Sequence, residues 1–277
     1  MIAGTGAVPA LDPVADAPSE AVAEFRDHGH ALVRGLCRAD EVAAYRPFIA
    51  EAARRRNPDP PPLAVRDTYG KAFIQSTNLW RLDDAVKAFV WAPRFAKVAA
   101  ELLGVDGVRL YHDQALFKEP DGGPTPWHQD QVYWPLDTDK TITMWMPLVD
   151  VPDEVGSMTF ASGSHRVADA GAFDISEASD AAVAAMVEDR GLALRTYGAV
   201  AAGDATFHAG WMLHRAGANP TSTMREVMTV IYFADGARAI EPVNDYQAFD
   251  LQVWLKGTAP GQRCDGPRNP SLWPPSA

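Results

Sequence analysis

The sequence predicts a mainly β fold, a sandwich or barrel, with helices flanking it in the N-terminal third. Three observations lead to this prediction. The 277 residues suit one large domain, because all-β sandwiches and barrels often reach this length undivided. Helical spacing of apolar residues dominates the first 104 residues. Beyond them, short apolar runs separated by turn residues indicate antiparallel strands.

The N-terminal flank, residues 19–104, is predicted to be mostly helical, after a loose arm at 1–18 that is rich in small residues. Pro47 interrupts the second helical pattern, so a kink or a break is expected there. The third pattern is the clearest and is closed by Gly104. The expected helices cover residues 19–25, 40–56 and 94–103, with a strand at 31–33.

The β core is predicted over residues 105–235, followed by a C-terminal extension at 236–277. The run 108–118 is read as one long strand. Residues 140–149 alternate between two faces, as a strand does. One helix, about 178–188, intervenes, and the whole chain is expected to form a single domain. Further strands are expected at 157–161, 192–197, 204–207 and 227–233.

Composition and charge limit the classes of function. The formal net charge of −11 argues against nucleic acid or an anionic membrane as partner, because both attract basic surfaces. The two cysteines, Cys37 and Cys264, have no metal-binding spacing and are expected to be reduced thiols. No leader pattern and no apolar run of bilayer length occurs. A cytoplasmic location and a small-molecule substrate are expected.

His128 and Asp130 form the motif that carries the most chemical information. In a strand, an imidazole and a carboxylate two positions apart point to the same face and can bind one metal ion. A second histidine completes a 2-His-1-carboxylate face, which leaves three positions of an octahedral iron open. His214 is the candidate for that histidine, so the three ligands must meet through folding.

His208 competes with His214 for the role of third ligand. Arg225, at the head of an apolar strand, favours His214 because its offset fits that histidine better. An arginine that emerges from a β core is costly to bury unless it meets an anion. Its planar guanidinium can hold a carboxylate through two parallel hydrogen bonds.

Together these motifs resemble the phytanoyl-CoA dioxygenase (PhyH) family of iron(II)- and 2-oxoglutarate-dependent oxygenases, and within it bacterial hydroxylases of small metabolites. The resemblance runs from about residue 20 to residue 235 and rests on the order and spacing of its pieces. The matching segments are 113–120 (DQALFKEP), 127–130 (WHQD), 143–145 (TMW), 156–160 (GSMTF) and 163–165 (GSH), followed by His214 and Arg225.

The resemblance implies a double-stranded β-helix, a form of jelly roll, with iron(II) held by His128, Asp130 and His214. It implies that Arg225 binds the distal carboxylate of 2-oxoglutarate, the co-substrate that is consumed with O2. Iron halogenases of related folds lack this carboxylate ligand. Asp130 therefore favours hydroxylation, with release of succinate and CO2.

Two further positions match the co-substrate pocket of family members. They are Gln114 and Trp145. The position two residues after the distal histidine is often a serine that helps to hold the co-substrate, but here it is Ala216. That hydrogen bond is expected to be absent or supplied elsewhere.

Several other residues have a structural interpretation beside a functional one. His112 is expected to be packed or hydrogen-bonded in the core, and His165 to be structural. Tyr133 and Trp134 are expected either to line the substrate cavity or to pack in the core. The substrate cavity is expected to be built from the N-terminal helices, residues 65–80, the segment after Asp130 and residues 244–254.

The predicted function is hydroxylation of an unactivated C–H bond of a small organic metabolite. Desaturation, epoxidation or cyclisation at the same iron is an alternative, because the outcome depends on where the substrate carbon lies. A cupin-like metal- or ligand-binding protein without redox chemistry is a second alternative. Arg225 argues against it, because such a protein needs no buried carboxylate clamp at that position.

Overall fold

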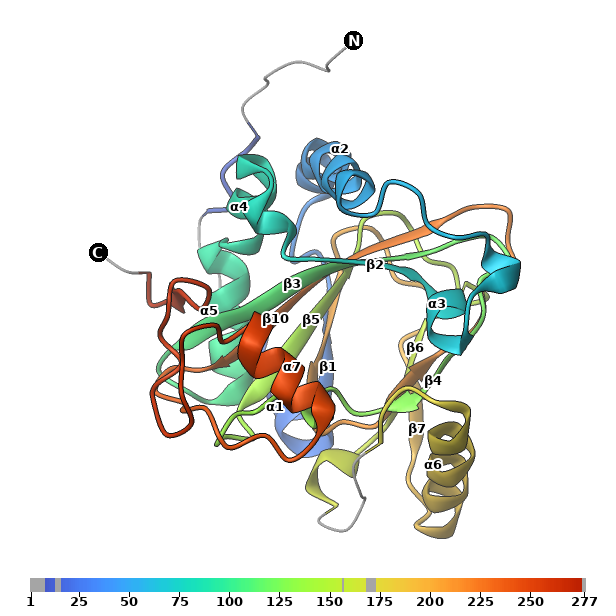
Figure 1. Ribbon diagram of the computed structural model, residues 1–277. Helices are drawn as coiled ribbons and strands as arrows, with labels where there is room; N and C mark the ends of the chain where they lie inside the picture. The colour runs from blue at the N-terminus through green and yellow to red at the C-terminus, as the bar shows by residue number, and fades with distance from the viewer. Residues whose placement is uncertain (1–7, 13–15, 156, 168–172, 276–277) are drawn as a thin grey trace.

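Two antiparallel sheets, assembled from strands far apart in the sequence, form the centre of the molecule (Figure 1). The computed structural model describes residues 8–12, 16–155, 157–167 and 173–275. The larger sheet has 7 strands in the order β1-β8-β5-β10-β3-β11, with β2 also paired to β3, and the smaller has 4 in the order β4-β9-β6-β7. The predicted fold class, a mainly β jelly roll with flanking helices, is confirmed.

The bounds of the elements show how the strands of one sheet are drawn from the whole chain. The larger sheet contains β1 (His30–Val33), β2 (Ile74–Thr77), β3 (Val108–Lys118), β5 (Thr141–Pro147), β8 (Ala205–Ala209), β10 (Arg225–Ala234) and β11 (Ser271–Trp273). The smaller sheet contains β4 (Thr125–His128), β6 (Met158–Ala161), β7 (Leu194–Thr196) and β9 (His214–Ala216). The helices are α1 (Ser19–His28), α2 (Ala39–Arg56), α3 (Thr68–Ala72), α4 (Asp84–Val90), α5 (Pro93–Leu103), α6 (Glu177–Asp189) and α7 (Asp245–Val253).

Four helices from the N-terminal part of the chain, α1, α2, α4 and α5, cover the outer face of the larger sheet (Figure 1). Burial of apolar surface between the two layers supplies the main cohesion there. The alternation predicted for residues 140–149 is confirmed. Met144 and Met146 of β5 join the cluster under the helices, whereas Thr143 and Trp145 point to the opposite face and line a cavity.

The strands β3 and β10 pair in the middle of the larger sheet, and one β-bulge interrupts their register. Ile231 pairs with His112, but the next residue, Tyr232, pairs with Leu110. Tyr111 is therefore the extra residue on β3. A bulge of this kind redirects side chains locally, and bulges are frequent next to functional sites.

Two expectations for the N-terminal flank need correction. Of the expected kink or break at Pro47, the break is absent, because α2 continues through this residue. Its buried residues on both sides of the proline, among them Tyr45 and Ile49, hold both halves on the same core and offset the lost hydrogen bond. Of the expected loose arm, residues 1–7 and 13–15 lie outside the described residues. Residues 8–12 are packed: Leu11 is buried.

The shorter elements α3, α4, α7, β2, β4, β9 and β11 were not predicted, and α7 gives structure to the expected C-terminal extension. Gly156 of the family-like segment lies outside the described residues. Within the described ranges, no helix combines the length and the apolar character needed to cross a membrane.

Candidate metal and co-substrate site

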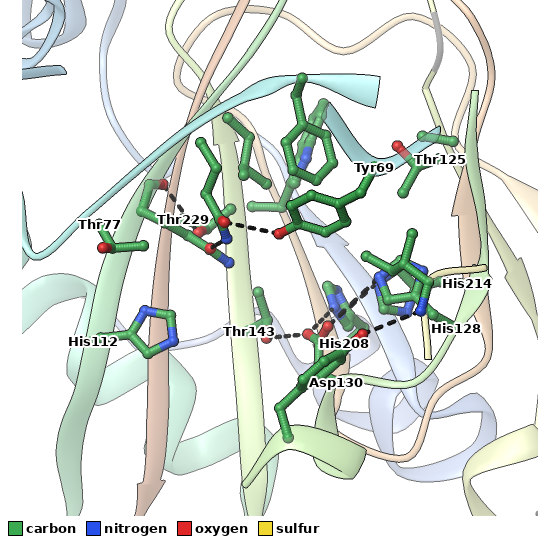
Figure 2. A pocket seen from close by; sticks show the side chains of 18 of the residues that line it. Tyr69, Thr77, His112, Thr125, His128, Asp130, Thr143, His208, His214 and Thr229 are labelled. Carbon is green, nitrogen blue, oxygen red and sulfur yellow. Dashed lines mark hydrogen bonds and ion pairs between the residues drawn. The ribbon is translucent and has the colours of Figure 1, made fainter. Parts of the chain in front are cut away.

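A cavity of about 300 Å³ lies between the two sheets (Figure 2). Its floor is formed by the inner faces of β3, β5 and β10, and its far wall by β4 and β9. The segments 65–80, 130–134 and 244–254 contribute as expected, whereas α1 and α2 supply none of its lining. The lining residues are Tyr69, Phe73, Gln75, Thr77, His112, Gln114, Leu116, Thr125, His128, Asp130, Tyr133, Trp134, Thr143, Trp145, Met158, Ile175, His208, His214, Arg215, Ala216, Arg225, Thr229, Tyr246, Phe249, Asp250 and Trp254.

His128, Asp130 and His214 come together on one side of this cavity, with one donor atom of each within 4.8 Å of the others. Asp130 Oδ1 lies 3.7 Å from His128 Nε2 and 3.8 Å from His214 Nε2. The two histidines sit side by side because β4 pairs with β9 and places His128 opposite His214. An ion with bonds of about 2 Å to each donor can bridge such gaps.

The premise that His128 and Asp130 share a strand is wrong, although their side chains do converge. His128 is the last residue of β4, and Asp130 is the first residue of a 3₁₀ turn, Asp130–Tyr133. Gln129, between them, keeps an extended backbone (φ −129°, ψ 130°), and its side-chain Nε2 donates to the carbonyl of Trp211 at 2.9 Å. The extended geometry of β4 thus continues through Gln129 and points both side chains to the same face, and the 3₁₀ turn begins only at Asp130.

Both histidines have the protonation pattern that a metal ligand requires. His128 Nδ1 lies 2.8 Å from the carbonyl oxygen of Pro126, and His214 Nδ1 lies 2.9 Å from that of Met212. Because a carbonyl only accepts, each Nδ1 carries the proton, and each Nε2 presents a lone pair. Burial lowers the pKa of both imidazoles, which keeps them neutral. The donor set therefore fits a divalent ion.

Asp130 is fixed by its second carboxylate oxygen. Oδ2 accepts hydrogen bonds from Thr143 Oγ1 at 2.8 Å and from His208 Nε2 at 3.1 Å. Burial raises the pKa of Asp130, but the charges of the nearby histidines, with His214 first, and the His208 hydrogen bond outweigh it and lower the pKa. The carboxylate is therefore ionised, with Oδ1 turned toward the two histidine ligands (Figure 2).

His208 thus lies close to the three candidate ligands without joining them. Its ring centre is 4.3 Å from that of His214, but its Nε2 donates to Asp130 and is not directed to the space between the ligand atoms. This geometry favours His214 as the third ligand. His208 instead orients the carboxylate of Asp130 through its hydrogen bond to Oδ2.

Arg225 lies in the same cavity, at the start of β10, with 2% of its surface exposed. Its guanidinium carbon is 5.4 Å from the centre of the Trp145 ring, so the two predicted co-substrate residues contact each other. Burial lowers the pKa of Arg225 to about 10, and the side chain remains a cation near neutral pH. The positive charge faces a cavity that also holds the candidate ligands, as 2-oxoglutarate requires.

Sequence reasoning missed Lys118, which pairs with Arg225 across β3 and β10. Lys118 is fully buried, and its Nζ donates to the carbonyl of Gly123. Burial, with a smaller effect from the charge of Arg225, lowers its pKa to about 7. The signal that could have revealed it is a lysine directly after the apolar run 115–117 at the end of the predicted strand. With a pKa of about 7, Lys118 is only partly charged near neutral pH, so Arg225 supplies most of the positive charge that suits a dianion.

Gln114 lines the cavity from the middle of β3 and takes part in a short chain of side-chain hydrogen bonds. Gln75 Nε2 donates to Gln114 Oε1, and Tyr69 donates to Gln75 Oε1 at 2.8 Å. This chain links α3 and β2 to the floor of the cavity. Ala216 also lines the cavity, and its methyl group offers no hydrogen bond in place of a serine.

The other polar and aromatic residues divide between structure and cavity. Tyr133 and Trp134 line the cavity. His112 was expected to be a core residue, but its ring reaches the cavity wall. His165 lies away from it and packs against Gly29, where a Cβ atom would come within 2.2 Å of the imidazole.

A jelly roll that holds two histidines and one carboxylate in a buried cavity defines a class, the non-haem iron oxygenases. A family model described as phytanoyl-CoA dioxygenase (PhyH) matches residues 25–227. A curated relative, a probable alpha-ketoglutarate-dependent hypophosphite dioxygenase of Stutzerimonas stutzeri, is 30% identical over 83 residues, which is 30% of this chain and 29% of that protein.

Solved structures extend this likeness over almost the whole chain. The alpha-ketoglutarate-dependent epimerase SnoN of nogalamycin biosynthesis is 28% identical, with a TM-score of 0.71 over 91% of this chain and 97% of that one. SnoN has also been solved with Fe3+, alpha-ketoglutarate and nogalamycin RO (29% identity, TM-score 0.72, the same coverage). The carbocyclase SnoK, at 24% identity and a TM-score of 0.74 over 96% and 99% of the two chains, shows the fold.

The chain therefore belongs to the phytanoyl-CoA dioxygenase (PhyH) family of non-haem iron- and 2-oxoglutarate-dependent oxygenases. The matched region contains the three candidate ligands and Arg225.

Proposed function

We propose that this protein hydroxylates an unactivated C–H bond of a small organic molecule, with iron(II), 2-oxoglutarate and O2. One observation carries the proposal: two neutral histidines, one ionised carboxylate and a buried arginine lie together in one cavity. The overall reaction balances as substrate, 2-oxoglutarate and O2 giving the alcohol, succinate and CO2.

The chain's own residues position the reactants. His128, Asp130 and His214 would hold the iron and leave three positions of an octahedral ion open. Arg225 would bind the distal carboxylate of 2-oxoglutarate through its planar fork, packed against Trp145. When bound, iron and 2-oxoglutarate together activate O2 at this site. The buried cavity would exclude bulk water and orient the C–H bond that reacts.

A second outcome at the same centre is a reaction other than hydroxylation. The observation that favours it is the likeness to the SnoN epimerase, at 28–29% identity over 91% of this chain. Epimerisation joins desaturation, epoxidation and cyclisation as alternatives that share the ligands and differ in where the substrate carbon lies. Product mass separates hydroxylation from epimerisation, because hydroxylation adds one oxygen atom and epimerisation leaves the mass unchanged.

The first test is anaerobic addition of iron(II) and 2-oxoglutarate to the purified protein. A weak visible charge-transfer band is expected in the wild type, and it should weaken strongly in Arg225→Gln at equal 2-oxoglutarate. A folded wild-type protein that gives no band would contradict the proposal and favour a non-redox cupin-like protein. Candidate metabolites are then screened for those that stimulate succinate formation, and the mass of each product is determined by mass spectrometry.

A further inference from the structure

At the end of the cavity beyond Gln114, toward α7, lies His112, whose ring nitrogen Nε2 has no role in the proposed function. His112 lies there on β3, with 7% of its surface exposed, and its ring projects into the cavity (Figure 2). The proposed iron ligands stand on the other side of the same space. A side chain in this position can contact the primary substrate and not the metal.

The bulge at Tyr111 is what brings His112 into the cavity. Leu110 and Ala115 belong to the core under the helices, and Gln114 lines the cavity. Tyr111 and His112 are consecutive, yet both lie on the inner side of the sheet, where Tyr111 packs in the cluster beneath α7. Without the extra residue, strict alternation would place only one of them there.

The polar atoms of His112 are not both satisfied by the protein. Its Nδ1 lies 3.4 Å from the carbonyl oxygen of Asp113, a weak contact that requires the proton on Nδ1. Nε2 then carries the lone pair and has no hydrogen-bond partner within the described residues. Burial lowers the pKa of His112 to about 4, so the ring is neutral and acts as an acceptor near neutral pH.

The surroundings of His112 are aromatic. The ring of Trp254 lies 5.1 Å from that of His112. Tyr246 and Phe249 of α7 line the cavity and remain 46% and 56% exposed. The nearby carboxylate of Asp250 already accepts a hydrogen bond from Tyr111 at 2.7 Å. An apolar, ring-containing molecule would pack against these aromatic faces. At this end of the cavity it would need one hydrogen-bond donor, directed to His112 Nε2.

We propose that His112 determines substrate specificity by accepting, through Nε2, a hydrogen bond from a hydroxyl group on an apolar, ring-containing primary substrate. This inference rests on the proposed function, because it assigns the cavity beside the iron to the substrate. A structural role is the competing explanation. It predicts that replacement of His112 lowers stability without changing which ligand is preferred.

The test uses the anaerobic complex of the full chain with iron(II) and 2-oxoglutarate, and three matched probes: 2-methylnaphthalene, 2-naphthalenemethanol and 2-naphthalenemethylamine. Their affinities are measured by calorimetry. The wild type should bind the alcohol about three- to tenfold more tightly than the hydrocarbon, the usual net gain from one hydrogen bond. His112→Phe should bind both equally, and His112→Gln should restore part of the preference. The exposed His28→Phe is the matched control and should behave as the wild type.

The outcomes separate the inference from the proposed function. If the charge-transfer band does not form in the wild type, the proposed function fails. If the band forms in every variant but the alcohol preference survives in His112→Phe, the inference fails. Equal binding of alcohol and hydrocarbon by the wild type, binding of neither probe, or a His112-dependent preference for the ammonium probe would also overturn it.

Discussion

The two ends of the cavity are built in different ways. At the metal end, both histidine side chains and the carboxylate are fixed by hydrogen bonds from sheet and turn, and the histidines are almost fully buried. At the opposite end, the wall is α7, whose Tyr246 and Phe249 remain substantially exposed. The metal end has the fixed geometry that binding of an ion needs, whereas the wall formed by α7 is aromatic and partly open to solvent.

The two ends of the cavity also differ in the pKa of the carboxyl group that each contains. Asp130 at the metal end has a lowered pKa because the histidines and their hydrogen bonds outweigh its burial. Asp250 at the opposite end has its pKa raised to about 7, because burial dominates over hydrogen bonds from Tyr111 and Trp254. One end is prepared for a cation, and the other disfavours charge. The predictions below test this contrast, beginning with the largest effect.

Removal of a proposed ligand should abolish iron binding. In His214→Ala the remaining imidazole and carboxylate hold the ion through two bonds only, and affinity should fall by more than the roughly 10–100-fold that supporting residues contribute. Iron content after dialysis measures this. His28→Ala, at an exposed site, provides the control. Retention of iron by His214→Ala, together with its loss in His208→Ala, would exchange the roles of the two histidines.

Loss of the arginine should weaken co-substrate binding and leave the metal in place. Arg225→Gln removes a buried cation from its anion, which typically costs about 2–5 kcal/mol, so the Kd for 2-oxoglutarate should rise on the order of 100-fold. Titration of the charge-transfer band gives this Kd without any substrate. Arg54→Gln is the matched control, since Arg54 is exposed on α2 and does not line the cavity. Equal effects in both variants would contradict the assignment.

A smaller effect is expected behind the carboxylate. His208→Phe and Thr143→Val each remove one donor to Asp130 Oδ2, which should weaken iron binding by about 10–100-fold while the ion still binds at saturation. Competition with a chelator measures the affinity. Unchanged affinity in both variants would show that the hydrogen bonds do not orient the carboxylate.

The long elements could be predicted because their signals are local. β3 and α5 have strong periodicity and end close to the predicted residues. The three proposed ligands could also be found from the spacing of His128 and Asp130 and the offset of Arg225. The position of His112 could not, because the bulge that directs it exists only in the register between β3 and β10. The helix α7 has weak periodicity, although the side chain of Asn244, which caps it, was a usable signal.

The last prediction concerns the pH dependence of stability at the α7 end, where neither the metal nor the co-substrate is involved. The pKa of Asp250 is about 7 in the folded protein, against 3.8 as its ordinary value. The folded state therefore binds its proton more tightly. The stabilisation is complete below about pH 4 and is lost as the pH rises toward 7, by at most about 1.4 kcal/mol per pH unit.

Asp250→Asn keeps a neutral side chain beside Tyr111 and removes this titration. Urea unfolding of the metal-free wild type and variant at several pH values measures the difference, in which Asp113, also raised to about 7, cancels. The variant should gain stability relative to the wild type as the pH rises from 4 to 7. Parallel curves would mean that Asp250 is charged in the folded protein, and the α7 end would then tolerate a charge as the metal end does.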